Sequence, residues 1–223
     1  MPTIQLYDQL QQFTLFQGMS HGDLMRIVAQ TKFGFVKLQP GKRLLKEGDH
    51  CDSICLLMSG SVNIETSADD HSYTVNEFLP APAILQAERL FGINRRSAST
   101  ITGTDGASLV TIDKKEVLTL ADNYLVFRLN LLNIFDTRAQ KLTRRTWARC
   151  PKSLQERIAR FIADRCLYPA GKKTINIYME RLAQELNDSR LDISRALNAM
   201  QAKGLITLSR GRITVPALEK LLN

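Results

Sequence analysis

Apolar and polar residues alternate in short runs between residues 33 and 112. Runs of this kind cover residues 33–38, 43–45, 53–58, 61–66, 73–75 and 107–112. Turn signals separate them, namely Pro40-Gly41, Gly48-Asp49, Ser59-Gly60 and Asp105-Gly106. Many short alternating runs with regular turn signals indicate an antiparallel sandwich or barrel. We therefore predict a β-domain here, preceded by a helix over residues 20–31 that Ser20 caps.

The pattern changes from a period of two to a helical period after residue 120. The stretch from Ala121 to Arg149 contains neither Pro nor Gly. Its apolar positions recur at steps of three and four and form a narrow seam of Leu125, Leu129, Leu132, Phe135, Ala139, Leu142 and Thr146. A narrow seam on a long helix favours pairing with a second copy of the chain. The alternative is a helix that packs only on its own β-domain.

Residues 179–206 show the apolar spacing of two amphipathic helices joined by a tight polar turn. Asn187 tolerates a left-handed backbone and can end the first helix. Ser189 can cap the second helix, with Asp192 completing a capping box, and Gly204 can end it. The predicted inward positions are Leu182, Ala183, Leu186, Ile193, Ala196, Leu197 and Met200. This layout predicts a DNA-reading helix-turn-helix, with a plain helical hairpin as the alternative.

The second helix of this motif would present polar and basic side chains in its exposed first turns. These candidate DNA-binding residues are Ser189, Arg190, Leu191, Ser194 and Arg195. Arginine can donate two hydrogen bonds to guanine O6 and N7, so Arg190 and Arg195 are candidate base readers. Residues 205–215 then alternate around a Ser-Arg-Gly-Arg turn and predict a β-hairpin wing whose Arg210 and Arg212 contact phosphates. The alternative is a surface hairpin whose charges only aid solubility.

Charge is distributed unevenly along the chain. Residues 1–137 hold 12 Lys/Arg against 15 Asp/Glu, whereas residues 138–223 hold 18 against 7, so the two parts carry net charges of −3 and +11. Neutralising phosphates releases counterions, and a basic surface therefore favours a polyanionic partner. The C-terminal part is the expected DNA-binding part, and its non-specific affinity for DNA should fall steeply with salt.

Length and composition limit the other classes of function. The 223 residues allow one or two domains, and 44% hydrophobic residues suffice for a core in each. No apolar run reaches the roughly 20 residues of a membrane span and the N-terminus lacks a signal-peptide core, so we expect a cytoplasmic protein without membrane contact. We expect the four cysteines to be reduced, and the Cys51-x-x-x-Cys55 spacing to bind no metal. No nucleophile elbow, P-loop or catalytic cluster occurs, so the sequence does not indicate an enzyme.

The order of these elements and several short motifs resemble the cyclic-AMP receptor protein/FNR family of bacterial transcription regulators. The matching motifs are Leu15-Phe16-x-Gly18-Met19-Ser20, Gly48-Asp49, Ser59-Gly60-Ser61-Val62, Arg96-Ser97-Ala98, Glu156-Arg157-Ile158-Ala159 and Ser189-Arg190-x-x-Ile193-Ser194-Arg195. The resemblance covers nearly the whole chain. It implies an α+β fold with an N-terminal double-stranded β-roll of the cyclic-nucleotide-binding type over residues 1–120, a dimerisation helix over 121–149 and a winged helix-turn-helix over 150–223.

In cyclic-nucleotide-binding members of the family, a Gly-Glu pair ten residues before an Arg-Ser pair builds a cassette for the cyclic phosphate. This chain keeps Arg96-Ser97 but has Leu85-Gln86 in place of Gly-Glu, and the preceding turn reads Ala81-Pro82-Ala83. A leucine side chain obstructs close backbone approach, and proline removes an N–H donor. The ligand-binding candidates that the resemblance implies are Gln86, Arg96, Ser97 and Thr143. We expect this site to be degenerate and not to bind a cyclic nucleotide.

Other sensor types of the family leave the effector unidentified. FNR-type sensors hold an iron–sulfur cluster with N-terminal cysteines, which residues 1–31 lack, so we expect no such cluster. A regulator that needs a cyclic nucleotide or haem in order to bind DNA is the alternative. Leu191 stands where cyclic-AMP receptor proteins read cytosine with an acidic residue, which predicts a different operator half-site.

Together these patterns predict a homodimeric, sequence-specific transcription regulator. It would bind a palindromic operator in double-stranded DNA and act with RNA polymerase. A ligand-binding module that acts on another protein would instead need an intact pocket and no basic C-terminal part. A DNA-coating protein would differ by a low ratio of specific to non-specific affinity.

Overall fold

The computed structural model describes residues 6–222, with the backbone alone at residues 145 and 146. The chain divides into two compact units. The first consists of residues up to 62, 80–97 and 102–147, and the second of residues 63–79, 98–101 and 148 onward. No helix within residues 6–222 is both long and apolar enough to cross a membrane.

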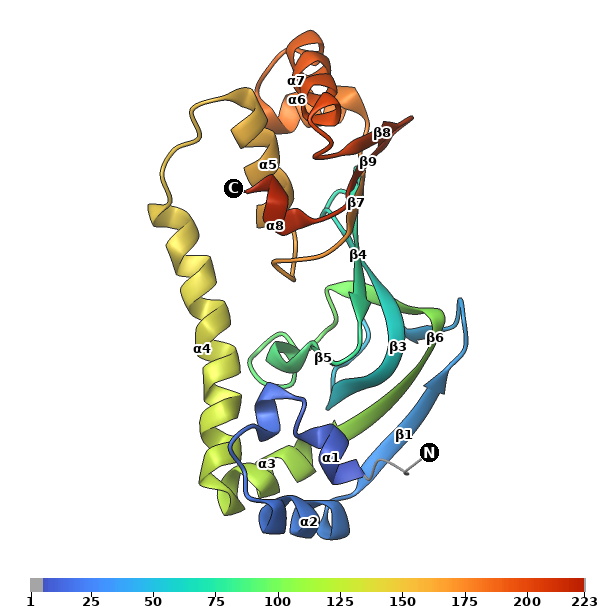
Figure 1. Ribbon diagram of the computed structural model, residues 1–223, viewed down its shortest axis with the longest axis vertical. Helices are drawn as coiled ribbons and strands as arrows, with labels where there is room; N and C mark the ends of the chain where they lie inside the picture. The colour runs from blue at the N-terminus through green and yellow to red at the C-terminus, as the bar shows by residue number, and fades with distance from the viewer. Residues whose placement is uncertain (1–5, 223) are drawn as a thin grey trace. The chain divides into compact units, whose positions relative to one another are not determined.

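The first unit is a β-roll with helices on either side of it in sequence (Figure 1). Its strands are β1 (Phe33–Leu38), β2 (Arg43–Leu45), most of β3 (Ser53–Ser67), β5 (Ala83–Leu85) and most of β6 (Ser99–Asp113). Its helices are α1 (Leu6–Leu10), η1 (Thr14–Phe16), α2 (His21–Gln30), η2 (Ala87–Arg89), α3 (Lys114–Asn123) and α4 (Leu125–Trp147). β6 pairs with β1 and β2, and β3 pairs with β5. The predicted β-domain is confirmed, as is the preceding helix, whose cap Ser20 accepts a hydrogen bond from the Asp23 N–H.

Two of the predicted turns are wrong, because Ser59-Gly60 and Asp105-Gly106 lie inside the long strands β3 and β6. Gly60 has a φ of +80°, and a Cβ on it would lie 1.9 Å from the carbonyl oxygen of Gly106. Glycine is required there because two backbones approach closely, which is the other common use of glycine in a strand. The two strands therefore continue where the sequence pattern predicts chain reversals.

The stretch predicted as one helix from Ala121 to Arg149 is divided at Tyr124, whose backbone is extended (φ −126°, ψ 103°). α4 then has two apolar faces. Phe127 and Leu131 are buried in the core of the first unit, and Phe135 of the predicted seam packs against that core. The other described seam residues, Leu125, Leu129, Leu132, Ala139 and Leu142, are exposed, and the Thr146 side chain lies outside the described residues. The helix therefore packs on its own β-roll and also keeps an exposed apolar seam.

The second unit is a helical cluster on a small antiparallel sheet (Figure 1). Its helices are α5 (Leu154–Asp164), α6 (Met179–Leu186), α7 (Arg190–Ala202) and α8 (Leu218–Leu221), and its strands include β4 (Thr74–Pro80), β7 (Lys173–Asn176), β8 (Thr207–Ser209) and β9 (Arg212–Val215). The strand order is β4-β7-β9-β8. The sequence pattern does not predict β7, which is only four residues long and carries a charged residue at a buried position.

A buried ion pair joins β4 to β7. The Nζ of Lys173 lies 2.8 Å from Oε1 of Glu77, and both side chains are 1% exposed. The Glu77 carboxylate also accepts hydrogen bonds from the backbone N–H groups of Leu167 (2.8 Å) and Tyr168 (3.0 Å). A buried carboxylate is tolerated only when its charge and its lone pairs are satisfied in this way. The pair therefore fixes β4 and the segment after α5 to the same point of the sheet.

Removing one partner of this pair should destabilise the protein strongly. We expect Lys173→Met to lower the free energy of unfolding by about 3–5 kcal/mol, because it leaves an unpaired buried charge. The double variant Glu77→Gln/Lys173→Met should recover only part of that loss, because it removes the unpaired charge but turns an amide NH₂ toward one of the two backbone N–H donors. The exposed neighbour Lys172→Met serves as the control. Urea unfolding monitored by circular dichroism measures the difference. Equal losses in the single and double variants would show that packing, rather than the unpaired charge, is responsible.

Candidate DNA-binding surface and effector region

The turn between α6 and α7 has the geometry of a helix-turn-helix. Asn187 is left-handed (φ 49°, ψ 56°), and the Ser189 hydroxyl accepts a hydrogen bond from the Asp192 N–H, as predicted. The capping box is formed only in part. The Asp192 carboxylate accepts from the Ser189 hydroxyl, whereas the Ser189 N–H donates to Asp188. The cap is therefore shared between Asp188 and Asp192, because both carboxylates lie within reach of the first turn.

The inner faces of α6 and α7 form the core of the second unit. All seven predicted inward residues pack there, with Leu186 at the edge and Leu182, Ala183, Ile193, Ala196, Leu197 and Met200 buried. Arg157 on α5 lies 2.9 Å from the Asp188 carboxylate and also donates to the Leu186 carbonyl oxygen. The turn is thus held by Arg157 of α5 as well as by its own cap, and these contacts fix the direction in which α7 leaves the turn.

The opposite face of α7 is open and basic. Arg190 and Arg195 are exposed, and each has an exposed acidic neighbour, Glu180 at 3.2 Å and Asp192 at 3.4 Å. Exposed ion pairs of this kind contribute little free energy, so either guanidinium can exchange its carboxylate for another acceptor. Leu191 is exposed beside them, Ser189 is exposed at the cap, and Ser194 is half-buried. The structure thus brings the five candidates of the recognition helix to its first turns.

The predicted wing is confirmed as a hairpin of β8 and β9 with Arg210-Gly211 at its turn. Gly211 is left-handed (φ +66°), which explains why glycine stands there. Arg210 and Arg212 are both exposed. A hollow of about 220 Å³ lies beside the turn, lined by Ser72, Asn176, Ile177, Tyr178, Arg210, Gly211 and Arg212. The hairpin therefore presents two cations on the solvent side.

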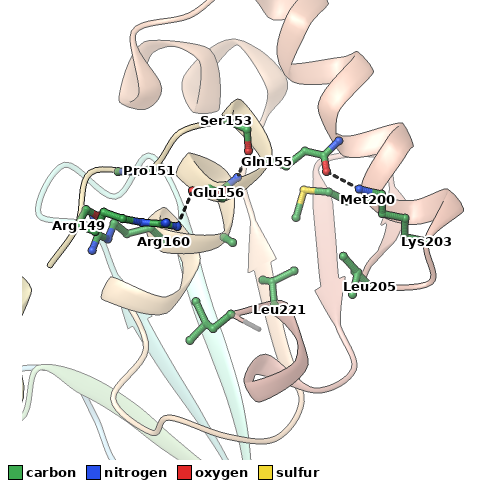
Figure 2. A pocket seen from close by; sticks show the side chains of 12 residues that line it. Arg149, Pro151, Ser153, Gln155, Glu156, Arg160, Met200, Lys203, Leu205 and Leu221 are labelled. Carbon is green, nitrogen blue, oxygen red and sulfur yellow. Dashed lines mark hydrogen bonds and ion pairs between the residues drawn. The ribbon is translucent and has the colours of Figure 1, made fainter.

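A larger hollow of about 580 Å³, which the sequence did not predict, lies among α5, α7 and α8 (Figure 2). Its walls combine apolar residues with Arg149, Arg160 and Lys203. Each cation already has a partner within the protein. Arg149 pairs with Glu156, Arg160 donates to the Arg149 carbonyl oxygen, and Lys203 donates to Gln155. This hollow adjoins the end of α7 at Met200 and Lys203, whereas the candidate base readers lie at its beginning.

The effector candidates lie in the first unit. Gln86 is buried with a left-handed backbone (φ 49°), and its side-chain oxygen accepts a hydrogen bond from the Cys51 thiol at 3.3 Å. Arg96 is exposed and donates to the Gly48 carbonyl oxygen at 2.7 Å. Ser97 is buried, with its N–H on the Asp49 carbonyl oxygen. Thr143 is exposed on α4 and donates to Ala139 of the same helix.

The cysteines do not form a metal site within the described residues, where no group of three potential metal-binding side chains occurs. All four cysteines are free thiols. Burial raises the pKa of Cys55 to about 11, and burial also raises the pKa of Cys51. Both thiols therefore stay protonated near neutral pH, and Cys51 serves as the donor to Gln86.

Two family models match separate parts of the chain. Residues 35–124 match the cyclic nucleotide-binding domain, and residues 156–223 match the Crp-like helix-turn-helix domain. No curated protein sequence matches the chain.

Several solved structures share the fold over almost the full length. The catabolite activator protein of Thermus thermophilus superposes with a TM-score of 0.54 at 19% identity, covering 94% of this chain and 96% of that one. The regulator CLP of Xanthomonas campestris, described as c-di-GMP responsive, gives 0.52 at 17% identity over 88% and 99%. A transcriptional regulator of the Crp/FNR family from Eubacterium rectale gives 0.51 at 20% identity over 94% and 98%. At these identities the likeness is one of fold.

The order of the two matched domains agrees with the order described above, a β-roll followed by a helix-turn-helix and its wing. The three matched structures are described as an activator protein, a global regulator and a transcriptional regulator. With a β-roll followed by a Crp-like helix-turn-helix that presents a basic, solvent-facing helix, the chain belongs to the Crp/FNR family of DNA-binding transcription regulators.

Proposed function

We propose that this regulator binds a palindromic operator as a homodimer, with α7 reading bases and the wing holding phosphates. The observation that carries the proposal is the pair Arg190 and Arg195, both about 70% exposed on the first turns of a helix whose other face is buried. This is the position from which a recognition helix reaches base edges in the major groove. Arg210 and Arg212 on the wing would add contacts to the DNA backbone, which set register and affinity.

The exposed seam of α4 supports pairing with a second copy of the chain. Leu125, Leu129, Leu132 and Leu142 are each 49–60% exposed, and Trp147 at the end of the helix is 83% exposed. Apolar side chains in a continuous stripe are favoured against a matching stripe because pairing removes both from water. Two-fold pairing along α4 would present two copies of α7 to successive major grooves, about 34 Å apart. A palindromic operator follows from that symmetry.

We infer that the β-roll does not respond to cyclic AMP through the family's phosphate cassette. Leu85-Gln86 replaces the Gly-Glu pair, and the Gln86 side chain is buried and bonded to Cys51. Presenting Gln86 to a ribose hydroxyl would require breaking that bond and exposing the amide. The Arg96 guanidinium is engaged with the Gly48 carbonyl oxygen. The regulator would then affect RNA polymerase by occupying its operator. Cyclic AMP would not control that occupancy.

The dimer can be tested with charges on the seam. We expect Leu129→Glu/Leu132→Glu to yield monomers in sedimentation velocity, because four carboxylates would face one another across a two-fold interface. Leu118→Glu is the matched control, since Leu118 is 48% exposed on α3, outside the seam. A dimer that persists in the seam variant would place the interface elsewhere.

The reading role can be tested after selecting an operator from a random duplex library with the unmodified protein. A two-fold symmetric consensus is expected. Arg190→Ala or Arg195→Ala should weaken binding to it by about 1–3 kcal/mol and relax the base preference at one position in each half-site. Arg210→Ala should weaken binding to the consensus and to a shuffled duplex alike. Equal loss on both duplexes for Arg190→Ala and Arg195→Ala would refute base reading.

Fluorescence anisotropy on the selected duplex, with and without cyclic AMP, tests the effector proposal. We expect the same dissociation constant in both conditions, because the cassette lacks its acidic ribose acceptor. Binding that appears only with cyclic AMP would show that Gln86 and Arg96 rearrange into a working site. An Arg96→Ala variant, measured in parallel, identifies whether any such response runs through the cassette.

A further inference from the structure

A row of side-chain hydrogen bonds crosses the sheet of the second unit, from the wing to the hairpin that β3 and β4 form. Nε of Arg212 on β9 donates to Oδ1 of Asn176 on β7 at 3.2 Å. Nδ2 of Asn176 donates to the hydroxyl of Thr74 on β4 at 3.0 Å. The three residues are direct cross-strand partners, Thr74 with Asn176 and Asn176 with Arg212. The row therefore follows the register of the sheet.

The chemistry of the row fixes its direction. A guanidinium only donates, so Asn176 must turn its carbonyl oxygen toward Arg212 and its NH₂ group toward Thr74. The Thr74 hydroxyl also accepts from Asn76 at 3.4 Å, and Asn76 accepts from Asn63 on β3 at 2.8 Å. The bond to Asn176 uses only the Nε of Arg212. It leaves the two NH₂ groups of the guanidinium to other partners, such as the oxygens of a phosphate.

The hairpin that carries Thr74 is anchored on both sides of that residue. On one side, the Tyr73 hydroxyl accepts from Arg165, the residue that caps the C-terminus of α5, at 2.6 Å, and the Tyr73 ring packs on Phe161 at 5.7 Å between centroids. On the other side stands the buried pair of Glu77 and Lys173. Thr74 therefore has little freedom to follow Arg212, and the constraint runs from the hairpin to the arginine.

The hollow beside the wing turn lies at the end of the same row. Ser72 of the hairpin and Asn176 line it together with Arg210 and Arg212. Two cations and a hydroxyl group on one concave surface suit a phosphate of the DNA backbone. Ser72, which precedes the helix-turn-helix by more than a hundred residues in sequence, thus lines the same hollow as the predicted phosphate contacts Arg210 and Arg212.

We propose that Thr74 is a positioning residue for DNA binding, which acts through Asn176 to hold the Arg212 guanidinium in the orientation that meets a DNA phosphate. The proposal rests on the phosphate contact of the wing proposed above. It makes the β3–β4 hairpin a working part of the DNA-binding unit, although in sequence that hairpin lies almost a hundred residues before the helix-turn-helix.

A double-mutant cycle on the selected duplex tests this. Thr74→Val removes the hydroxyl and keeps the shape of the side chain, and we expect it to weaken DNA binding about two- to tenfold, the range of one hydrogen bond. The slope of log affinity against log salt should become shallower by up to about 0.9 per protomer. Thr74→Ser should restore both values. Thr174→Val, on the same face of β7 as Asn176, is the matched control and should bind like the unmodified protein.

The cycle separates positioning from a general loss of structure. In an Arg212→Ala background, Thr74→Val should have no further effect on DNA affinity, and thermal unfolding of each variant records any change in stability. Unchanged affinity in Thr74→Val, or an equal loss with and without Arg212, would overturn the proposal. If Thr74→Val does not fold, Asn176→Ala takes its place in the same cycle with the same expectations.

A measurement without DNA gives an independent result. In ¹⁵N-resolved NMR spectra, the Nε–H of Arg212 should exchange with water faster in Thr74→Val than in the unmodified protein or in Thr74→Ser. Unchanged exchange would overturn the positioning role even if DNA affinity falls. If the unmodified protein selects no duplex at all, the proposed operator binding fails, whereas the NMR result still decides whether Thr74 orders the arginine.

Discussion

The DNA-binding unit depends on one buried electrostatic constraint, the pairing of Glu77 with Lys173. Burying both charges is expensive, and only the combination of the ion pair with two backbone N–H donors makes the site stable. Because one partner lies on β4 and the other on β7, the site allows a single register between the strands. The row from Thr74 through Asn176 to Arg212 is aligned as a consequence of that register.

The helix α4 has one face in the core of the β-roll and an apolar face exposed to solvent. Its inner face, with Phe127 and Leu131, completes the core of the β-roll, and its outer face leaves Leu125, Leu129, Leu132 and Leu142 in contact with water. The outer stripe contributes no hydrophobic stabilisation in a monomer, because it stays in water, whereas a dimer would bury it. The helix would therefore link the fold of each β-roll to the spacing of two recognition helices.

In the proposed function, the residues at the family's cassette positions serve in packing rather than in ligand binding. Gln86 replaces an acidic residue of the family's cassette, and its amide is directed inward to the Cys51 thiol, whose raised pKa keeps it a donor. The neutral Gln86 side chain is thus satisfied by a partner within the protein. Leu85, which stands at the position of the glycine, is itself 1% exposed and is part of the packed interior.

The sequence by itself determined the elements whose signals are local. The cap at Ser189, the left-handed turn at Asn187, the inward face of α7 and the wing turn at Gly211 all follow from neighbouring residues, and the structure confirms them. The sequence pattern wrongly predicts turns at Gly60 and Gly106 and does not predict the strand β7, in each case for a physical reason. Gly60 is needed because two backbones approach closely there, and Gly106 because its φ is +86°. The buried Lys173 of β7 is paired with Glu77, which lies nearly a hundred residues away in sequence. Only the tertiary structure decides such features, since long-range pairing overrides local preference and links Thr74 to the wing through Asn176.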